Sequence, residues 1–345
     1  MARRESRMRP GSFSWICQQP VAPITGRPVT AKENLKLCYD GEVPYWMPIW
    51  MHDFQWIWPD VILEHPQYEA DGKDWFGAEW VYVEEAGGSM VKPGTRLVKD
   101  FLNWREEMKF PDLEAVDFAS DAEFQKEIYD PDRLHLFQTT EGCFERLHEV
   151  IPFDEALLAM AEEPEEVEAF FSAVADYKIA VLKKVFEYYD PIDIVTYSDD
   201  WGTQRAGFFS KGMYEELIVP HTRRICEFIK SQGKYLELHS CGMCQQYVPY
   251  FIDMGIDSWT PQNCNDFDFL KKEFGDKITF NMAVPGLNRP GLTVEEARQA
   301  ARDFVDRFAG RGRVLAQVSA PTPEIRDAVY KELYEYSSEH YAKLR

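Results

Sequence analysis

The chain has 345 residues, of which 45% are hydrophobic and 28% are charged, so it can form a sizeable core and is not globally disordered. Its formal net charge of −21 disfavours nucleic acid and anionic membrane surfaces as partners, because both would be repelled. Seven scattered cysteines, no apolar run of about 18 residues and no signal-peptide core predict a cytoplasmic protein with reduced thiols and no membrane span.

The N-terminal part is expected to form an arm and a short helix over residues 1–40, followed by a single catalytic domain over residues 41–345. Thr30 and Glu33 have the spacing of a capping box, which predicts that the helix begins there. Three strands are expected before residue 102, at 45–51, 78–84 and 96–101. The last two flank a segment rich in glycine and proline, so we expect a β-hairpin excursion.

From residue 134 onward, short apolar runs alternate with amphipathic helical stretches, which predicts a parallel sheet covered by helices. No GxGxxG loop follows the first strand, so a closed (β/α)8 barrel, the TIM-barrel fold, is favoured over a dinucleotide-binding open sheet. Capping residues predict late helices that begin after Thr293 and after Thr322. Besides 45–51, the barrel strands that can be assigned are 134–139, 192–197, 234–239, 256–260, 278–283 and 313–318, which leaves one strand unassigned.

Polar side chains stand at the carboxyl ends of five predicted strands, where barrels of this class carry their chemistry. They are Glu141, Asp199 and Asp200, His239 and Cys241, Gln262, and Asn281. Successive residues of a strand face opposite ways, so only one of Asp199 and Asp200 is expected to face the site. Any one of these residues is compatible with an ordinary loop cap, but their convergence favours an active site.

The sharpest local cluster is LHSCGMC, residues 238–244. His239 and Cys241 are separated by one residue, so on an extended strand end both side chains point the same way and can share a metal ion. A tight turn would also bring Cys244 to that ion, and zinc suits an imidazole and a thiolate. The alternative interpretation is a buried cysteine that packs as a small hydrophobic residue beside a histidine bonded to a backbone carbonyl.

Five segments carry a resemblance to a known family. They are DWFGAEW (74–80), KFPDLE (109–114), GCFERLHEVIPFDEALLAMAEEPEEV (142–167), the stretch 193–262 that includes DIVTYSDDWGTQ and LHSCGMC, and APTPEIRDAV (320–329). Together they resemble the uroporphyrinogen decarboxylase superfamily, which also contains corrinoid-dependent methyltransferases. The resemblance covers most of the chain from about residue 28 onward, and it implies a TIM barrel with its site at the carboxyl ends of the strands.

Two features bear on the branch of this superfamily. The decarboxylases carry an arginine-rich segment after the first strand, whose cations bind the carboxylates of a porphyrinogen. Residues 50–60 are WMHDFQWIWPD instead, without arginine and with two acidic residues. The electrostatic potential of such a segment repels a polyanion. The methyltransferases hold zinc with an HxC pair, matched by His239 and Cys241, and with a later cysteine that is missing from RVLAQVSAPTP (313–323). The candidates for the third ligand are Cys244, Cys264, Asp199 and Glu141.

The resemblance, with the late cysteine missing, implies a methyltransferase of the O-demethylase kind, which passes a methyl group from a small methoxylated aromatic donor to a corrinoid. No DxHxxG corrin-binding motif occurs in the chain, so the corrinoid is expected on a separate protein. Zinc at His239 and Cys241 is expected to act as a Lewis acid on the ether oxygen. The expected catalytic residues are Asp199, Asp200 and Glu141, and the expected substrate-binding residues are Trp50, His52, Trp56, Tyr197, Gln262 and Asn281.

Two other functions stay open. One is decarboxylation of a substrate that is smaller or less charged than uroporphyrinogen. The other is non-catalytic binding of a corrinoid or tetrapyrrole on an enzyme scaffold. The aromatic residues between 45 and 75 are compatible with core packing as well as with stacking on a ring. A homodimer is one assembly compatible with the sequence.

Overall fold

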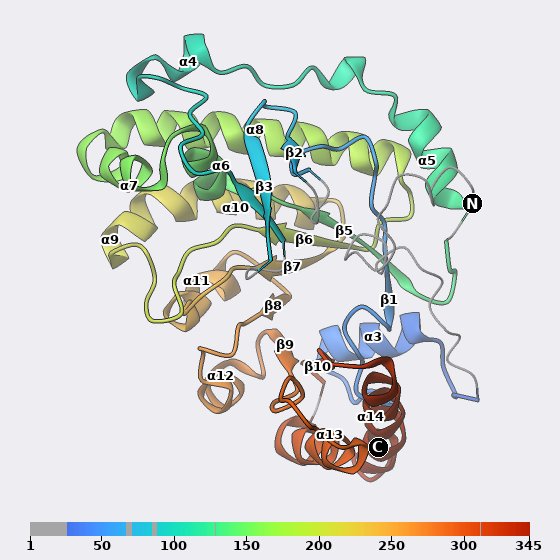
Figure 1. Cartoon of the computed structure of the whole chain (residues 1–345). Helices are drawn as coiled ribbons and strands as arrows, with labels where there is room; N and C mark the ends of the chain where they lie inside the picture. The colour runs from blue at the N-terminus through green and yellow to red at the C-terminus, as the bar shows by residue number, and fades with distance from the viewer. Residues whose placement is uncertain (1–25, 67–70, 85–87, 128, 311) are drawn as a thin grey trace.

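A computed structural model describes residues 26–66, 71–84, 88–127, 129–310 and 312–345, so most of the arm predicted for residues 1–40 lies outside the described residues. Within them, a curled sheet of seven parallel strands is covered by helices, which is an α/β fold (Figure 1). In order across the sheet the strands are β1 (Phe54–Trp56), β5 (Leu134–Thr139), β6 (Ile194–Ser198), β7 (Tyr235–His239), β8 (Ser258–Thr260), β9 (Thr279–Ala283) and β10 (Val314–Gln317).

The two edges of this sheet meet through the segment that precedes β1. Ile49 forms an isolated parallel bridge with Ala316 of β10, and the Ala316 N–H donates to the carbonyl of Pro48 at 2.9 Å. The strand predicted at 45–51 is therefore wrong in extent: one bridge forms at Ile49, and the strand itself is β1, which pairs with β5 on the other edge. Met51, with φ 62, turns the chain between the two contacts. Six of the predicted strands correspond to β5 through β10.

The helices begin where their capping residues stand. Both predicted capping boxes are formed, Thr30 with Glu33 at α3 (Ala31–Asp40) and Thr293 with Glu296 at α13 (Val294–Phe308). Thr322 caps α14 (Pro323–Ala342), which packs against α13. No helix in the described part of the chain is long and apolar enough to cross a membrane. The remaining longer helices are α5 (Phe118–Lys126), α6 (Cys143–Val150), α7 (Phe153–Glu162), α8 (Pro164–Tyr188), α10 (Val219–Ser231), α11 (Val248–Asp253) and α12 (Phe267–Phe274).

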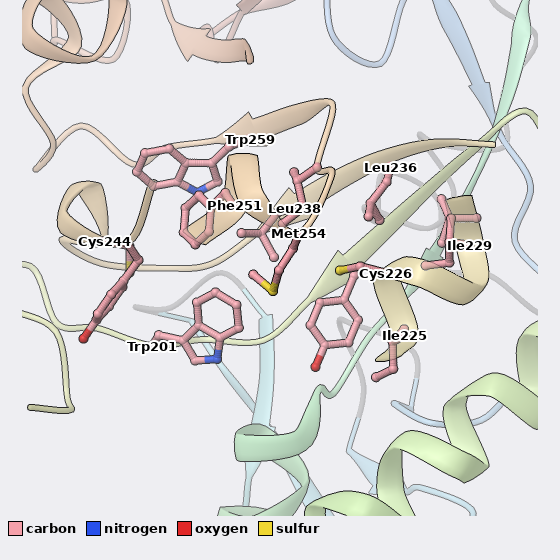
Figure 2. Close-up of a cluster of buried hydrophobic side chains, with 14 of the residues drawn as sticks. Trp201, Ile225, Cys226, Ile229, Leu236, Leu238, Cys244, Phe251, Met254 and Trp259 are labelled. Atoms are coloured by element: carbon pink, nitrogen blue, oxygen red, sulfur yellow. The ribbon is translucent and has the colours of Figure 1, made fainter. Parts of the chain in front are cut away.

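One part of the core lies between β7 and β8 on one side and α10 and α11 on the other (Figure 2). Its side chains are fully or almost fully buried, which stabilises the fold by about 1.5–3 kcal/mol for each large apolar residue. Cys244, from the loop after β7, belongs to this cluster and is 0% exposed. The labelled members are Trp201, Ile225, Cys226, Ile229, Leu236, Leu238, Cys244, Phe251, Met254 and Trp259.

Helix α3 closes the amino ends of the strands. The N–H of Arg313 donates to the carbonyl of Cys38 at 3.0 Å, and the hydroxyl of Tyr235 at the start of β7 donates to Asp40 at 3.1 Å. Beneath the helix lies a separate apolar cluster, with Trp50, Met51, Trp58 and Tyr235 packed against it. Its buried members are Leu35, Cys38, Tyr39, Phe54, Trp56, Leu134, Leu136, Ile194 and Leu315.

A second, antiparallel sheet forms the predicted excursion, with β2 (Gly72–Lys73), β3 (Glu79–Val83) and β4 (Gly88–Val91). The strand predicted at 96–101 is wrong, because the partner of β3 is β4, inside the segment expected to be the connection. Pro93 follows β4, and the chain then leaves the sheet to bind a helix. The N–H groups of Leu97 and Val98 both donate to the carbonyl of Val150, at 2.9 and 3.1 Å.

Candidate active site

A cavity of about 740 Å³ opens at the carboxyl ends of β5, β6 and β7. The strand ends and α6 form one wall, and the β3–β4 sheet with the segment that follows it forms another. We call it the acidic cavity, because among the described residues five carboxylate side chains line it and Lys92 is the only lysine or arginine that does. The carboxylates are Glu141, Glu145, Glu149, Asp154 and Asp200, and the larger aromatic side chains are Trp80, Phe153 and Phe208.

Three potential metal ligands meet at the edge of this cavity. One ligand atom each from Asp200, His239 and Cys241 lies within 4.8 Å of the other two. Cys241 Sγ is 3.4 Å from His239 Nε2, which is 4.0 Å from Asp200 Oδ1. The backbone N–H of Cys241 also donates to Asp200 Oδ1 at 2.7 Å, which orients that carboxylate.

The register of two neighbouring strands produces this cluster. Ser198 at the end of β6 pairs with His239 at the end of β7, so the two strands end level with each other. Asp200 lies two residues beyond Ser198, and Cys241 lies two residues beyond His239, so alternation along each chain brings all three side chains to the same face. Asp200 is thus the third potential ligand, a residue expected to be an acid or base rather than a ligand.

None of the four residues proposed from the sequence as third ligand belongs to this group in the described part of the chain. Cys244 lies in the hydrophobic core, where its thiol donates to the carbonyl of Cys241 at 3.3 Å (Figure 2). Cys264 is half-buried in the loop after β8, and its sulfur accepts from the Asn265 side chain at 3.6 Å. Glu141 lines the acidic cavity, apart from the cluster.

Asp199 faces away from the acidic cavity and holds the start of α6. It is 0% exposed, and its carboxylate accepts from the N–H groups of Phe144 and Glu145 at 3.2 and 2.9 Å. Burial raises the pKa of Asp199 to about 7 although these N–H groups lower it. A Cβ atom on Gly142 would lie 2.3 Å from the Asp199 carboxyl carbon, so only glycine allows this approach. The catalytic role predicted for Asp199 is therefore replaced by a helix-capping one.

The loops after β6 and β7 are packed tightly against each other, which fixes the cluster. Gly242 has φ 88, and a Cβ on it would lie 2.2 Å from the carbonyl carbon of Gly202. The N–H of Gly242 donates to Gln262 Oε1 at 2.8 Å, and the side chain of Gln204 donates to the same oxygen at 2.6 Å. Gln262 therefore ties three strand-end loops together.

The acidic wall rests on buried ion pairs. Arg146, which is 1% exposed, contacts Asp74 at 2.7 Å and Glu149 at 2.6 Å. Lys178 contacts Glu64 at 2.7 Å, with side chains that are 1% and 2% exposed. Asp74 and Glu64 belong to the segment that carries the β2–β4 sheet, so these pairs attach the excursion to α6 and α8.

Two of the cavity carboxyls differ in their preference for the proton. Burial raises the pKa of Glu149 well above its usual range. Burial also raises the pKa of Glu141, but the hydrogen bond from Glu149 and the nearby cations outweigh it and leave that pKa below its usual value. Glu149 therefore holds its proton more strongly than Glu141 does. Glu141 adopts φ 57, a conformation that costs a non-glycine residue on the order of 1–2 kcal/mol.

Several predicted substrate-binding residues do not line the acidic cavity. Trp50 and Trp56 stack edge to face, with ring centroids 5.7 Å apart, against the apolar cluster that α3 closes. Both therefore lie with the side chains of α3 and not with the acidic cavity. His52 Nδ1 is 2.5 Å from the hydroxyl of Tyr334 on α14, and burial lowers the pKa of His52 to about 4.

The other predicted contacts are also elsewhere. The side chain of Tyr197 is 0% exposed, and its hydroxyl donates to Asp199 at 3.2 Å. Asn281 is 0% exposed and donates to the hydroxyl of Thr260 at 3.3 Å. Gln262 lines a second cavity, which shares His239 with the first. Of the predicted site residues, the acidic cavity brings together Glu141, Asp200, His239 and Cys241.

Sequence reasoning missed the residues that α6 contributes. Glu145, His148 and Glu149 line the acidic cavity together with Glu141, which immediately precedes the helix start. Residues four apart on a helix share a face, and Glu145 and Glu149 of α6 have that spacing. This spacing, counted from the strand end, was a signal that pointed to them.

Comparisons with known proteins agree with this architecture. A family model for uroporphyrinogen decarboxylase (URO-D) matches residues 76–313. A methyltransferase from Methanosarcina mazei superposes with a TM-score of 0.60 at 13% sequence identity, covering 91% of this chain and 99% of that one. A structure of L-ribulose 3-epimerase gives a TM-score of only 0.39 at 12% identity, covering 68% and 85% of the two chains. At 13% identity the likeness to the methyltransferase concerns the fold alone. No curated protein matches the chain.

Proposed function

Because the chain belongs to the uroporphyrinogen decarboxylase family, we propose that it is a methyltransferase of that family. It would take a methyl group from a small methoxylated aromatic donor and pass it to a corrinoid on a separate protein. The observation that carries this proposal is the cluster of Asp200, His239 and Cys241 at the edge of the acidic cavity. Three protein ligands beside an open cavity are the donor arrangement of a catalytic zinc site.

The donor set fits zinc in chemistry and in spacing. Tetrahedral ligands with zinc bonds of about 2.0–2.3 Å lie on the order of 3.5 Å from one another. The 3.4 Å between Cys241 Sγ and His239 Nε2 agrees with that spacing, and Asp200 Oδ1 at 4.0 Å from His239 Nε2 needs only a small movement. A zinc ion bound there would supply Lewis-acid polarisation of the donor's ether oxygen.

The acidic cavity supports a small, uncharged aromatic donor. Trp80, Phe153 and Phe208 offer ring faces and edges on which an aromatic donor can pack. A porphyrinogen with many carboxylates would face five carboxyl side chains and one lysine, so the electrostatics oppose it. Glu141 and Glu145 face the same cavity and are positioned to exchange a proton with the leaving group.

Two further expectations belong to this proposal. We take the curled sheet, joined at its edges by Ile49 and Ala316, to be a (β/α)8 barrel in which the eighth strand is reduced to a bridge. We also propose a cytoplasmic location, since a thiolate ligand at Cys241 needs a reduced cysteine and the six cysteines of the described residues are unpaired.

Metal analysis tests the proposal directly. We expect about one zinc per chain in protein purified without chelators, loss of that zinc in His239→Ala and Cys241→Ser, and full retention in Cys264→Ser. Less than about a tenth of an equivalent in the unaltered protein would remove the Lewis-acid role.

Turnover is the second test, with free cob(I)alamin as acceptor and a panel of methoxyarenes and methylamines as donors. We expect demethylation of at least one methoxyarene, followed as the absorbance change from cob(I)alamin to methylcobalamin. No transfer from any donor, together with release of carbon dioxide from a small carboxylate, would favour decarboxylation instead.

A further inference from the structure

A second cavity, of about 430 Å³, lies at the carboxyl ends of β8, β9 and β10. His239 lines it as well as the acidic cavity, so the two cavities share this residue of the proposed metal cluster. The acidic cavity lies on the α6 side of His239, and the second cavity lies on the side of the loops after β8 and β9. The two cavities therefore approach one reaction centre from different directions.

The chemistry of the second cavity is the opposite of the first. Within the part of the chain that the structure describes, no aspartate, glutamate, lysine or arginine lines it, although the chain carries a net charge of −21 and 28% charged residues. Its polar lining consists of carboxamides and hydroxyls. We call it the amide cavity after its five carboxamide side chains, Gln204, Gln262, Asn263, Asn288 and Gln317.

Hydrogen bonds within the rim hold several of these amides in place. Gln262 Oε1 accepts from Gly242 and from Gln204, so both of its lone pairs are used and its NH2 group remains the part that can donate to a ligand. Asn288 on the loop after β9 donates to Ser319 on the loop after β10 at 3.1 Å. The rim is therefore organised before a ligand arrives.

We propose that the amide cavity receives the methyl acceptor, and that its carboxamides bind the neutral amide side chains on the edge of a corrin ring. This inference rests on the proposed function. Carboxamides both donate and accept hydrogen bonds, so a ring fringed with amides finds partners along the rim. A rim without charged groups also avoids the cost of removing an ion from water when the large, mostly apolar macrocycle covers it.

The position of the amide cavity suits the geometry of displacement. The bond between the methyl carbon and the donor oxygen breaks, and its electron pair stays on the oxygen. An electron pair of cobalt(I) forms the new bond to the same carbon, and a proton from solvent or a cavity carboxyl completes the leaving group. Attack occurs from the side opposite the leaving oxygen, so donor and acceptor need separate approaches that converge. The two cavities on either side of His239 provide them.

Binding of free hydroxocobalamin, followed by equilibrium dialysis and by absorbance, tests the assignment without requiring turnover or bound metal. We expect Gln317→Glu and Asn288→Asp to raise the Kd for cobalamin at least about tenfold, because each places a carboxylate against a neutral rim. Gln317→Met removes only the hydrogen bonds and should have a smaller effect. Phe153→Ala, in the acidic cavity, should leave the cobalamin Kd within about twofold and raise the KM for the methyl donor instead.

The outcomes separate this inference from the function on which it rests. Equal cobalamin binding by the unaltered protein and the amide-cavity variants, or no binding by the unaltered protein, would overturn the inference even if methyl transfer occurs. Cobalamin binding that weakens in Gln317→Glu, in a protein that transfers no methyl group from any donor, would support the amide cavity and reject the proposed reaction.

Discussion

The two ends of the curled parallel sheet are closed by different physical means. At the amino end, α3 covers a cluster of aliphatic and aromatic side chains that includes Leu35, Phe54 and Trp56. At the carboxyl end, the β2–β4 excursion is attached through the buried pairs of Arg146 with Asp74 and Lys178 with Glu64, and two cavities remain. The aromatic residues near β1 thus pack in the core at the amino end, whereas the charged residues gather at the carboxyl end, where the candidate site lies.

This difference has energetic consequences. Apolar contacts are non-directional. Truncating one of their side chains lowers the free energy of unfolding in proportion to the buried surface and volume that are lost. Ionic closure in the interior is directional, and loss of one partner leaves the other charged and buried. Substitutions in the site at the carboxyl end should therefore lower activity more than stability, and substitutions at the amino end should lower stability and leave activity unchanged.

The largest expected effect is on catalysis at the carboxyl end. His239→Ala should lower methyl transfer at least about a thousandfold, on the order of 4 kcal/mol in the activation free energy, while the thermal midpoint changes little because His239 is half-exposed. His52→Ala, which alters a histidine packed on α14, should leave kcat and KM within about threefold. Steady-state kinetics on both variants test the contrast. A loss of methyl transfer in His52→Ala would show that His52 takes part in the reaction after all.

The next effect is on the buried ion pairs of the excursion. Arg146→Met should lower the free energy of unfolding by about 3–5 kcal/mol, because Asp74 and Glu149 lose their shared cation. Urea denaturation measures this loss. The matched control is Lys92→Met, which removes the exposed pair with Glu79 in the same excursion and should cause no measurable change. Equal stability of the two variants would contradict ionic closure.

A smaller effect is expected at the amino end. Leu35→Ala removes a fully buried side chain beneath α3 and should cost about 2–4 kcal/mol of unfolding free energy, while the KM for the donor stays unchanged. The comparison is sharpened by measuring both quantities on one preparation. A rise in the donor KM would show that the two ends are coupled.

The smallest effect concerns the helix caps. Thr30→Ala and Thr293→Ala each remove a capping oxygen and should each cost about 1 kcal/mol in denaturation experiments. Because the two sites lie on different helices and share no partner, the double variant should show the sum of the single losses. A loss in the double variant that clearly exceeds the sum of the two single losses would mean that α3 and α13 are energetically coupled.

Much of the fold followed from local patterns in the sequence. Alternation of apolar runs and amphipathic stretches located β5 through β10, and capping residues located the starts of α3, α13 and α14. The segment around β1 was harder, because continuous aromatic content does not fix a register. The positions of Trp50 and Trp56 depend on the bridge of Ile49 with β10 and on the pairing of β1 with β5, which are tertiary contacts.

The candidate site was predictable where spacing alone determined it. His239 and Cys241 share a face because they are two residues apart on a strand end. The choice between Asp199 and Asp200 needed tertiary information. The carboxylate of Asp199 accepts hydrogen bonds from the first N–H groups of α6, and Gly142 leaves room for this approach. The carboxyls of α6 stand on a helix, so the alternation of side chains along a strand end does not predict them, although the helix begins shortly after β5.

The bridge between Ile49 and Ala316 joins a segment that is synthesised early to one that is synthesised late. While a nascent chain still lacks β10, the outer flank of β9 presents unpaired backbone N–H and carbonyl groups, as an open sheet edge does. Such an edge invites pairing with another chain until the last strand arrives. Production of this protein should therefore suffer most from truncations that remove β10 and the two helices around it.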